Sequence, residues 1–242
     1  MFNIIKVSNE QQFNETGAGI IASLLQTNPR ANLGLATGGT PVGVYQHLIE
    51  LYKKGLVSFK EARSYNLDEY IGLPEDHSES YRRFMNEKLF NHVDIDMNNT
   101  HVPAGVSGDG HKAAEEYNAL LEQAGQIDLQ LLGLGHNGHI GFNEPAEELK
   151  ATTHVVELDE VTRKANARYF NSIDEVPTHA ITMGIGSIMK AKQILLMAKG
   201  ADKAEIIAKA LKGPVTTQCP ASLLQLHPNV VVIVDQDAGR LL

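Results

Sequence analysis

Apolar positions along the chain predict short buried strands that alternate with amphipathic helices. The strand candidates are nearly continuous apolar runs, as expected for strands that are covered on both faces. We expect strands at residues 3–7, 32–36, 62–67, 127–132, 153–158, 180–183, 193–198 and 229–235, and a short edge strand that ends at 101–103.

Between these runs, apolar residues recur at helical spacing. Ser8 and Gln11 form a candidate capping box for the first helix. Pro41 suits the first position of the second helix and Thr40 its cap. We expect helices at residues 8–26, 42–54, 78–90, 110–123, 159 to about 170, 185–190 and from 199–203 to 213, and a short one from 220.

Alternating strands and helices predict an α/β fold with a mostly parallel sheet and helices on both faces. The length of 242 residues suits a single domain, residues 1–242. A hydrophobic content of 43% and a charged content of 21% predict a packed core.

Net charge and cysteine content limit which binding partners and which cellular compartment we expect. The net charge of −8 argues against a nucleic-acid partner, so an anionic substrate needs a local cationic site. The single cysteine, Cys219, excludes an intrachain disulfide and fits a reducing cytoplasm. We found no signal-peptide core or membrane-length apolar stretch, and we expect a cytoplasmic protein without a membrane partner.

Residues 131–145, LLGLGHNGHIGFNEP, are the strongest chemical feature. They follow a predicted strand, and ligands of open α/β sheets bind at the carboxyl ends of strands. Two histidines, two asparagines and a glutamate give this loop groups that can move protons. Its glycines let the backbone approach a ligand closely.

Two other interpretations of this loop are weaker. Gly133, Gly135 and Gly138 match the dinucleotide fingerprint, which must open directly into a helix. Gly141 and Pro145 disfavour that helix. The spacing of His136 and His139 is only a weak metal signal, and we expect no metal site.

Three further features lie at predicted strand ends. Thr37, Gly38, Gly39 and Thr40 separate a strand from a helix, and are either a phosphate or carboxylate cradle or an ordinary turn. Asp68 and Glu69 are either acid–base groups or part of a helix cap or solvated turn. Lys203 stands at a predicted helix start, which is unfavourable unless an anion binds there.

The motifs LATGGTPVGVY, YNLDEYIGL, SYRRFMN, GHNGHIGFNEP, TRKANARYF and LLQLHP, taken together, resemble the glucosamine-6-phosphate isomerase family essentially from end to end. The resemblance implies a Rossmann-like, doubly wound fold without a dinucleotide, metal or organic cofactor. It implies conversion of D-glucosamine 6-phosphate and water to D-fructose 6-phosphate and ammonia, a step of amino-sugar catabolism.

The resemblance also implies roles for individual residues. Asp68 matches the base that moves a proton from C2 to C1, and His139 matches the group that opens the sugar ring with Asn137 and Glu144. The phosphate contacts match Thr37, Gly38, Gly39, Thr40, Arg168 and Lys203. Many members have aspartate in place of Asn137. We therefore expect Asn137 to orient neighbours, with Glu144 as the carboxylate partner of His139.

Two other functions share parts of this pattern. A 6-phosphogluconolactonase would hydrolyse an ester and would need no base for C2, which Asp68 and the GFNEP ending argue against. A sugar-phosphate-sensing regulator would carry a helix-turn-helix segment, for which we see no spare length in the chain.

Regulation is where the sequence departs from part of the family. Some longer members are hexamers that bind N-acetylglucosamine 6-phosphate through hydroxyls and basic residues after the NEP motif, and through a C-terminal extension. Here Glu147, Glu148, His154 and Val156 occupy the matching region, and the sequence ends at Leu242. We therefore expect a non-allosteric enzyme that is a monomer or small homo-oligomer.

Overall fold

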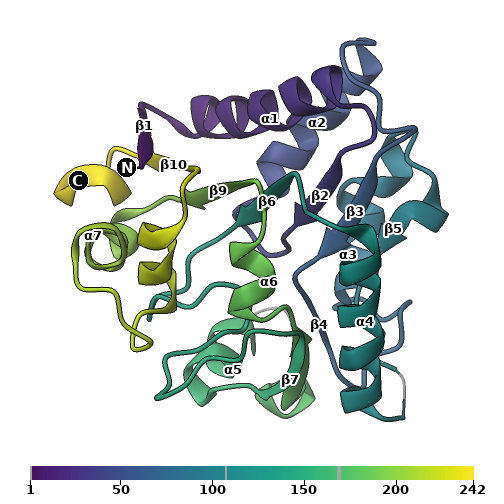
Figure 1. The fold of residues 1–242 in the computed structure, drawn as a ribbon, viewed down its shortest axis with the longest axis vertical. Coiled ribbons are helices and arrows are strands. Elements are labelled where there is room, and N and C mark those ends of the chain that lie inside the picture. The colour runs from purple at the N-terminus through teal and green to yellow at the C-terminus, as the bar shows by residue number, and fades with distance from the viewer. Residues whose placement is uncertain (1, 107, 168–169) are drawn as a thin grey trace.

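The computed structural model of the chain describes residues 2–106, 108–167 and 170–242. Its centre is a seven-stranded sheet in the order β1-β10-β9-β6-β2-β3-β5, in which every neighbouring pair is parallel (Figure 1). The strands are β1 (Asn3–Val7), β2 (Asn32–Leu35), β3 (Arg63–Asn66), β5 (Thr100–His101), β6 (Leu129–Leu132), β9 (Gln193–Ala198) and β10 (Val230–Asp235).

Helices cover both faces of this sheet, as the alternating pattern predicted. The connections between the strands place α1 and α2 on one face and α4, α6 and α7 on the other (Figure 1). The α-helices are α1 (Glu10–Thr27), α2 (Val42–Lys53), α3 (Tyr81–Lys88), α4 (Gly110–Ala124), α5 (Glu160–Asn166), α6 (Ile185–Met189) and α7 (Ala204–Lys212). The 3-10 turns are η1 (Phe90–His92), η2 (Met97–Asn99), η4 (Ile173–Glu175), η5 (Ala201–Lys203), η6 (Pro220–Leu226) and η7 (Ala238–Leu241).

The order of the strands creates a switch point between β2 and β6. These two strands are neighbours, but the chain leaves β2 towards β3 and leaves β6 towards β9, on the opposite side. The loops that follow them therefore diverge and leave a crevice beyond the carboxyl ends of the two strands. Thr37 and Thr40 lie on one of these loops, and His139 lies on the other.

A second, three-stranded antiparallel sheet was not predicted. It consists of β4 (Asp68–Tyr70), β8 (His179–Thr182) and β7 (His154–Glu157) in the order β4-β8-β7. Leu67 joins the two sheets, because its N–H bonds to the carbonyl of Leu35 and its carbonyl accepts from Met183. We expected residues 68–70 to be a loop, but their partners are more than a hundred residues away and no local pattern indicates the pairing.

The starts of the first two helices differ from the predictions. Asn9, not Ser8, caps α1: its Oδ1 accepts from Gln12 N at 2.9 Å, and Gln12 Oε1 accepts from Ser8 N at 3.0 Å. The cap thus lies one residue further along than predicted, and Gln12 bonds back to the residue before the cap rather than to the cap itself, as a capping box would require. In α2 the N-cap is Pro41 rather than Thr40, so the Thr40 side chain is not used as a cap.

Packing of α1 onto the sheet shows why small residues stand inside this helix. Phe13, Ile21 and Leu25 are buried on its inner face. At Gly17, a β-carbon would lie 2.8 Å from the terminal methyl of Met197 on β9, so a larger residue there would force the Met197 side chain to shift.

Candidate active site

A cavity of about 380 Å³ lies at the switch point, beyond the carboxyl ends of β2 and β6. It brings together residues that the sequence analysis selected from four separate stretches of the chain. The predicted site residues that line it are Thr37, Gly38, Gly39, Thr40, Asp68, Asn137, His139 and Lys203. Glu144 contacts His139 from just behind this lining.

Asp68 is the buried acid of the cavity. It opens β4 and is 7% exposed. Burial, and then the negative charge of Glu69, raise the pKa of Asp68 to about 8. Once ionised, such a carboxylate is a much stronger base than an exposed aspartate.

Glu69 points elsewhere and caps a helix. Its Oε1 accepts from the backbone N–H groups of Tyr70 at 2.8 Å and Tyr81 at 2.9 Å, and its Oε2 accepts from Arg82 N at 2.9 Å. The two interpretations that the sequence left open therefore separate: Glu69 accepts the first two N–H groups of α3, next to the N-cap Ser80, and Asp68 is the carboxyl in the cavity.

His139, Glu144 and Asn137 form one hydrogen-bonded group. Glu144 Oε2 lies 3.1 Å from His139 Nδ1 and accepts from Asn137 Nδ2 at 2.5 Å. Asn137 Oδ1 accepts from the backbone N–H of His139 at 3.2 Å. Asn137 thus orients both neighbours, and Glu144 is the carboxylate that contacts the imidazole, as expected.

Glu144 stays ionised despite partial burial. Burial alone raises the pKa of Glu144, but the hydrogen bond and charge of His139, together with hydrogen bonds from Thr162 and Asn137, lower it to about 2. The bond from Thr162 Oγ1 to Glu144 Oε1 is 2.6 Å long. The imidazole therefore lies beside a fixed negative charge.

Two glycines explain how the loop folds around His139. At Gly135, a β-carbon would lie 2.3–2.4 Å from atoms of the His139 ring, so only glycine leaves room for the imidazole. Gly138 has a φ of 90°, a conformation that favours glycine, and a β-carbon there would meet Cys219 Sγ at 2.7 Å. Cys219 is thus a packing residue beneath the loop.

The other end of the cavity has the features of an anion site. The loop from Thr37 to Thr40 leads from β2 into α2, and Lys203 ends η5 at the start of α7. The fold brings these distant segments to one cavity. Arg168, the other predicted phosphate contact, lies outside the described residues. In the described part, α5 ends at Asn166 rather than near residue 170.

The weaker interpretations find no support in the geometry. Residues 139–159, all of which the structure describes, contain no helix, so the glycines do not form a dinucleotide-binding turn. His136 pairs with Asp202 at 2.8 Å on the surface. Among the described residues, no group of three or more His, Cys, Asp or Glu side chains could hold a metal ion, and no helix is long and apolar enough to cross a membrane.

The cavity also contains residues that sequence reasoning did not single out. Thr162 and Tyr81 both line it, from α5 and α3. The ring of Tyr81 stacks on Phe142 with their centroids 6.2 Å apart. Each residue stands inside a quoted motif, TRKANARYF or SYRRFMN, but only the fold reveals that these motifs meet the histidine loop.

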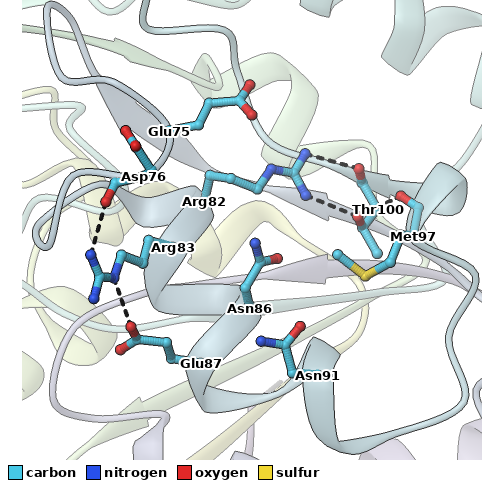
Figure 2. Close-up of a pocket in the computed structure, with 9 residues that line it drawn as sticks. All are labelled: Glu75, Asp76, Arg82, Arg83, Asn86, Glu87, Asn91, Met97 and Thr100. Carbon is cyan, nitrogen blue, oxygen red and sulfur yellow. Dashed lines mark hydrogen bonds and ion pairs between the residues drawn. The ribbon is translucent and has the colours of Figure 1, made fainter.

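A second hollow of about 620 Å³ lies on the outer side of α3 (Figure 2). Its arginines are engaged: Arg82 donates to Thr100 Oγ1 at 2.9 Å and to the Thr100 carbonyl at 3.0 Å, and Arg83 donates to Glu87 at 2.7 Å. The two bonds of Arg82 tie α3 to the edge strand β5, and the bond of Arg83 lies within the helix.

Comparison with known proteins identifies the family. Residues 8–233 match the family of glucosamine-6-phosphate isomerases and 6-phosphogluconolactonases. The chain belongs to this family. A glucosamine-6-phosphate deaminase of Clostridium perfringens is 51% identical over 239 residues, 99% of each chain. One of Lachnoclostridium phytofermentans is 54% identical over 230 residues, 95% of this chain and 98% of its own length.

Solved structures of the family confirm the predicted fold class. A monomeric glucosamine-6-phosphate deaminase, 44% identical, superimposes with a TM-score of 0.96 and covers 99% of this chain and 100% of its own. The 6-phosphogluconolactonase of Thermotoga maritima, at 21% identity, has a TM-score of 0.78 over 97% of this chain and all of its own, and so shares the fold.

Proposed function

We propose that this chain deaminates D-glucosamine 6-phosphate, giving D-fructose 6-phosphate and ammonia. The observation that carries the proposal is the shared cavity, in which a buried carboxyl, a histidine–glutamate pair and a threonine–glycine loop with a lysine face the same space. Each of these groups suits one part of the reaction. Relatives with half of their residues in common are named for this activity.

Ring opening is assigned to His139. The imidazole takes the proton of the C1 hydroxyl and returns it to the ring oxygen, so the C1–ring oxygen bond breaks and C1 becomes an aldehyde. Glu144, ionised because its pKa is about 2, holds the imidazole and stabilises its cation during this step. Asn137 and Thr162 fix the two oxygens of Glu144.

Proton transfer from C2 to C1 is assigned to Asp68. The carboxylate removes the C2 proton, the electrons form a C1–C2 double bond, and the C1 oxygen takes a proton from the substrate's own C2 ammonium group. Asp68 then delivers its proton to C1, which leaves an iminium at C2. Water adds to C2 and ammonia leaves, giving the ketone. One buried carboxylate on one side of the sugar suffices for both transfers.

The phosphate is assigned to the loop of Thr37, Gly38, Gly39 and Thr40 together with Lys203 and Arg168. Backbone N–H groups of such a loop and a nearby ammonium both favour an anion. Because the whole chain carries a net charge of −8, this local site is what makes a dianionic substrate acceptable.

A direct assay separates this proposal from lactone hydrolysis. The chain is incubated with glucosamine 6-phosphate and, separately, with 6-phosphogluconolactone, and ammonia and both products are followed. We expect equal amounts of ammonia and fructose 6-phosphate from the first substrate. Lactone hydrolysis without ammonia release from the amino sugar would refute the proposal.

Assembly belongs to the same proposal. The chain is expected to act as a monomer or small homo-oligomer, because all of the cavity's assigned groups come from one chain and the related structure described above is of a monomeric enzyme.

A further inference from the structure

Glu69 is a buried carboxylate with an unusually complete set of donors. It is 3% exposed, and its two oxygens accept three backbone N–H groups within 2.9 Å. Two of these donors, Tyr81 and Arg82, begin α3, where the helix dipole favours a negative charge. Because neighbouring residues of a strand point to opposite faces, Glu69 is fixed on α3 while Asp68 faces the cavity.

The helix that Glu69 caps is itself anchored. Arg82 holds α3 on the edge strand through two hydrogen bonds to Thr100 (Figure 2). Gly105 lies so close to β4 that a β-carbon there would be 1.9 Å from the carbonyl oxygen of Tyr70 and 3.1 Å from Glu69 Cγ. The backbone that carries Asp68 is thereby packed against both α3 and the segment of Gly105.

Glu69 is also the nearest charge to Asp68 along the chain. Of two adjacent buried carboxyls, the one with three N–H donors ionises first, so Asp68 loses its proton beside an existing negative charge. Burial raises the pKa of Glu69 too, and the N–H groups of Tyr81, Arg82 and Tyr70 oppose that rise. Other titratable groups near the pair are Tyr81 and Arg82 on α3, Tyr117 on α4, His139 and Lys203.

We infer that Glu69 is a positioning residue for the Asp68 base: its carboxylate fixes β4 on the first turn of α3, and its charge adjoins Asp68 in the strand from the opposite face. The inference rests on the proposed deaminase function. In this role Glu69 acts through Asp68 and does not contact the substrate.

Glu69→Gln tests the role of the charge. The amide has the size of the carboxylate but is neutral, and its NH₂ group opposes one of the three backbone donors. We expect kcat to fall at least about tenfold, with KM changed less than about threefold. The acidic limb of the pH profile of kcat/KM should move to lower pH by at least about half a unit, because Asp68 then ionises beside a neutral group.

Two companion variants make the test specific. Glu87→Gln removes a carboxylate that pairs with Arg83 on the exposed side of the same helix, and should leave the limb unmoved. Glu69→Asp keeps the charge but is one methylene shorter, so kcat should fall at least about fivefold while the limb stays within about 0.2 units of wild type. This variant also tests the positioning role if the Gln protein does not fold.

The results that overturn the inference are distinct from failure of the proposed function. Ammonia release by the wild-type chain tests the function. With an active wild type, an unmoved acidic limb in Glu69→Gln, or a wild-type kcat in Glu69→Asp, overturns the role of Glu69 alone.

Discussion

The raised pKa of Asp68 favours catalysis but lowers the stability of the folded chain. Its pKa is about 8 in the folded chain, against about 4 in an unfolded one, so folding tightens its hold on a proton. The free energy of unfolding therefore falls as the pH rises from about 4 to about 8, where the folded protein must ionise a buried group. The same shift brings the pKa of the base close to the pH at which it would act, so the lost stability has a use in catalysis.

Asp68→Asn should therefore stabilise the protein while removing turnover. We expect a gain of at least about 1 kcal/mol at pH 8, or about 3 °C in melting temperature for a chain of this size. The gain should be smaller at pH 5, where Asp68 is protonated in the folded state. Thermal unfolding of both proteins at the two pH values measures it. A gain in stability over wild type that is smaller at pH 8 than at pH 5 would contradict the raised pKa of Asp68.

His139→Gln should separate ring opening from the later steps. The cyclic substrate needs the imidazole to open its ring. An analogue without the 4- and 5-hydroxyls cannot close a ring and therefore does not need the imidazole. We expect kcat to fall at least about a hundredfold on the cyclic sugar and less than about tenfold on the open analogue. Comparable losses on both compounds would assign His139 to another step.

At the scale of residues, the sequence revealed the groups with unusual chemistry but not their partners. Asp68, His139, Glu144 and Lys203 were predicted, and the structure describes all four in or against one cavity. Thr162 and Tyr81 were missed, because a threonine or tyrosine on a helix is ordinary until the fold shows which loop it faces. The role of Glu69 stayed open because a cap and an acid have the same residue type.

Among the elements, the pair of loops at the switch point has the most specific consequence. Lys203 follows β9 and the Thr37–Thr40 loop follows β2, and these distant segments meet at the cavity because β9 and β2 flank β6 in the sheet. If they bind the phosphate, Lys203→Ala should raise KM for glucosamine 6-phosphate at least about tenfold, with a smaller change in kcat.

A matched control is available at the same strand end. Lys199 follows β9, four residues before Lys203, and pairs with Glu10 on the surface. Lys199→Ala removes the same charge from the molecule without touching the cavity, so its KM should stay within about twofold of wild type. Equal effects of the two substitutions would indicate a general effect of charge rather than a phosphate contact.

The central strands of the main sheet, such as β6, β9 and β10, were predictable because they are nearly continuous apolar runs. The small sheet was not, because β4 contains Asp68, Glu69 and Tyr70 and reads locally as a polar loop. Its hydrogen-bond partner is β8, which is far away in the sequence and comes next to β4 only when the chain is folded. The helix caps were displaced by one residue for a similar reason: several polar residues in succession can each serve as a cap.

For the whole molecule, the main prediction concerns regulation by a second ligand. Glu147 and Glu148 are exposed where some relatives are expected to receive the phosphate of an activator, and their charges oppose an anion. We expect hyperbolic dependence of the rate on glucosamine 6-phosphate, with less than about 1.5-fold change on adding N-acetylglucosamine 6-phosphate. Steady-state kinetics with both compounds measures this, and a sigmoidal curve that the N-acetyl sugar makes hyperbolic would refute it.

The most direct test of the account follows the proton that Asp68 is proposed to carry. Glucosamine 6-phosphate deuterated at C2 is converted in ordinary water, and ammonia and the position of deuterium in the fructose 6-phosphate are measured by NMR and enzymatic assay. The account predicts one ammonia per ketose, some deuterium at C1 with wild-type protein, and neither product with Asp68→Asn. Turnover by Asp68→Asn at more than about a tenth of the wild-type rate would contradict it.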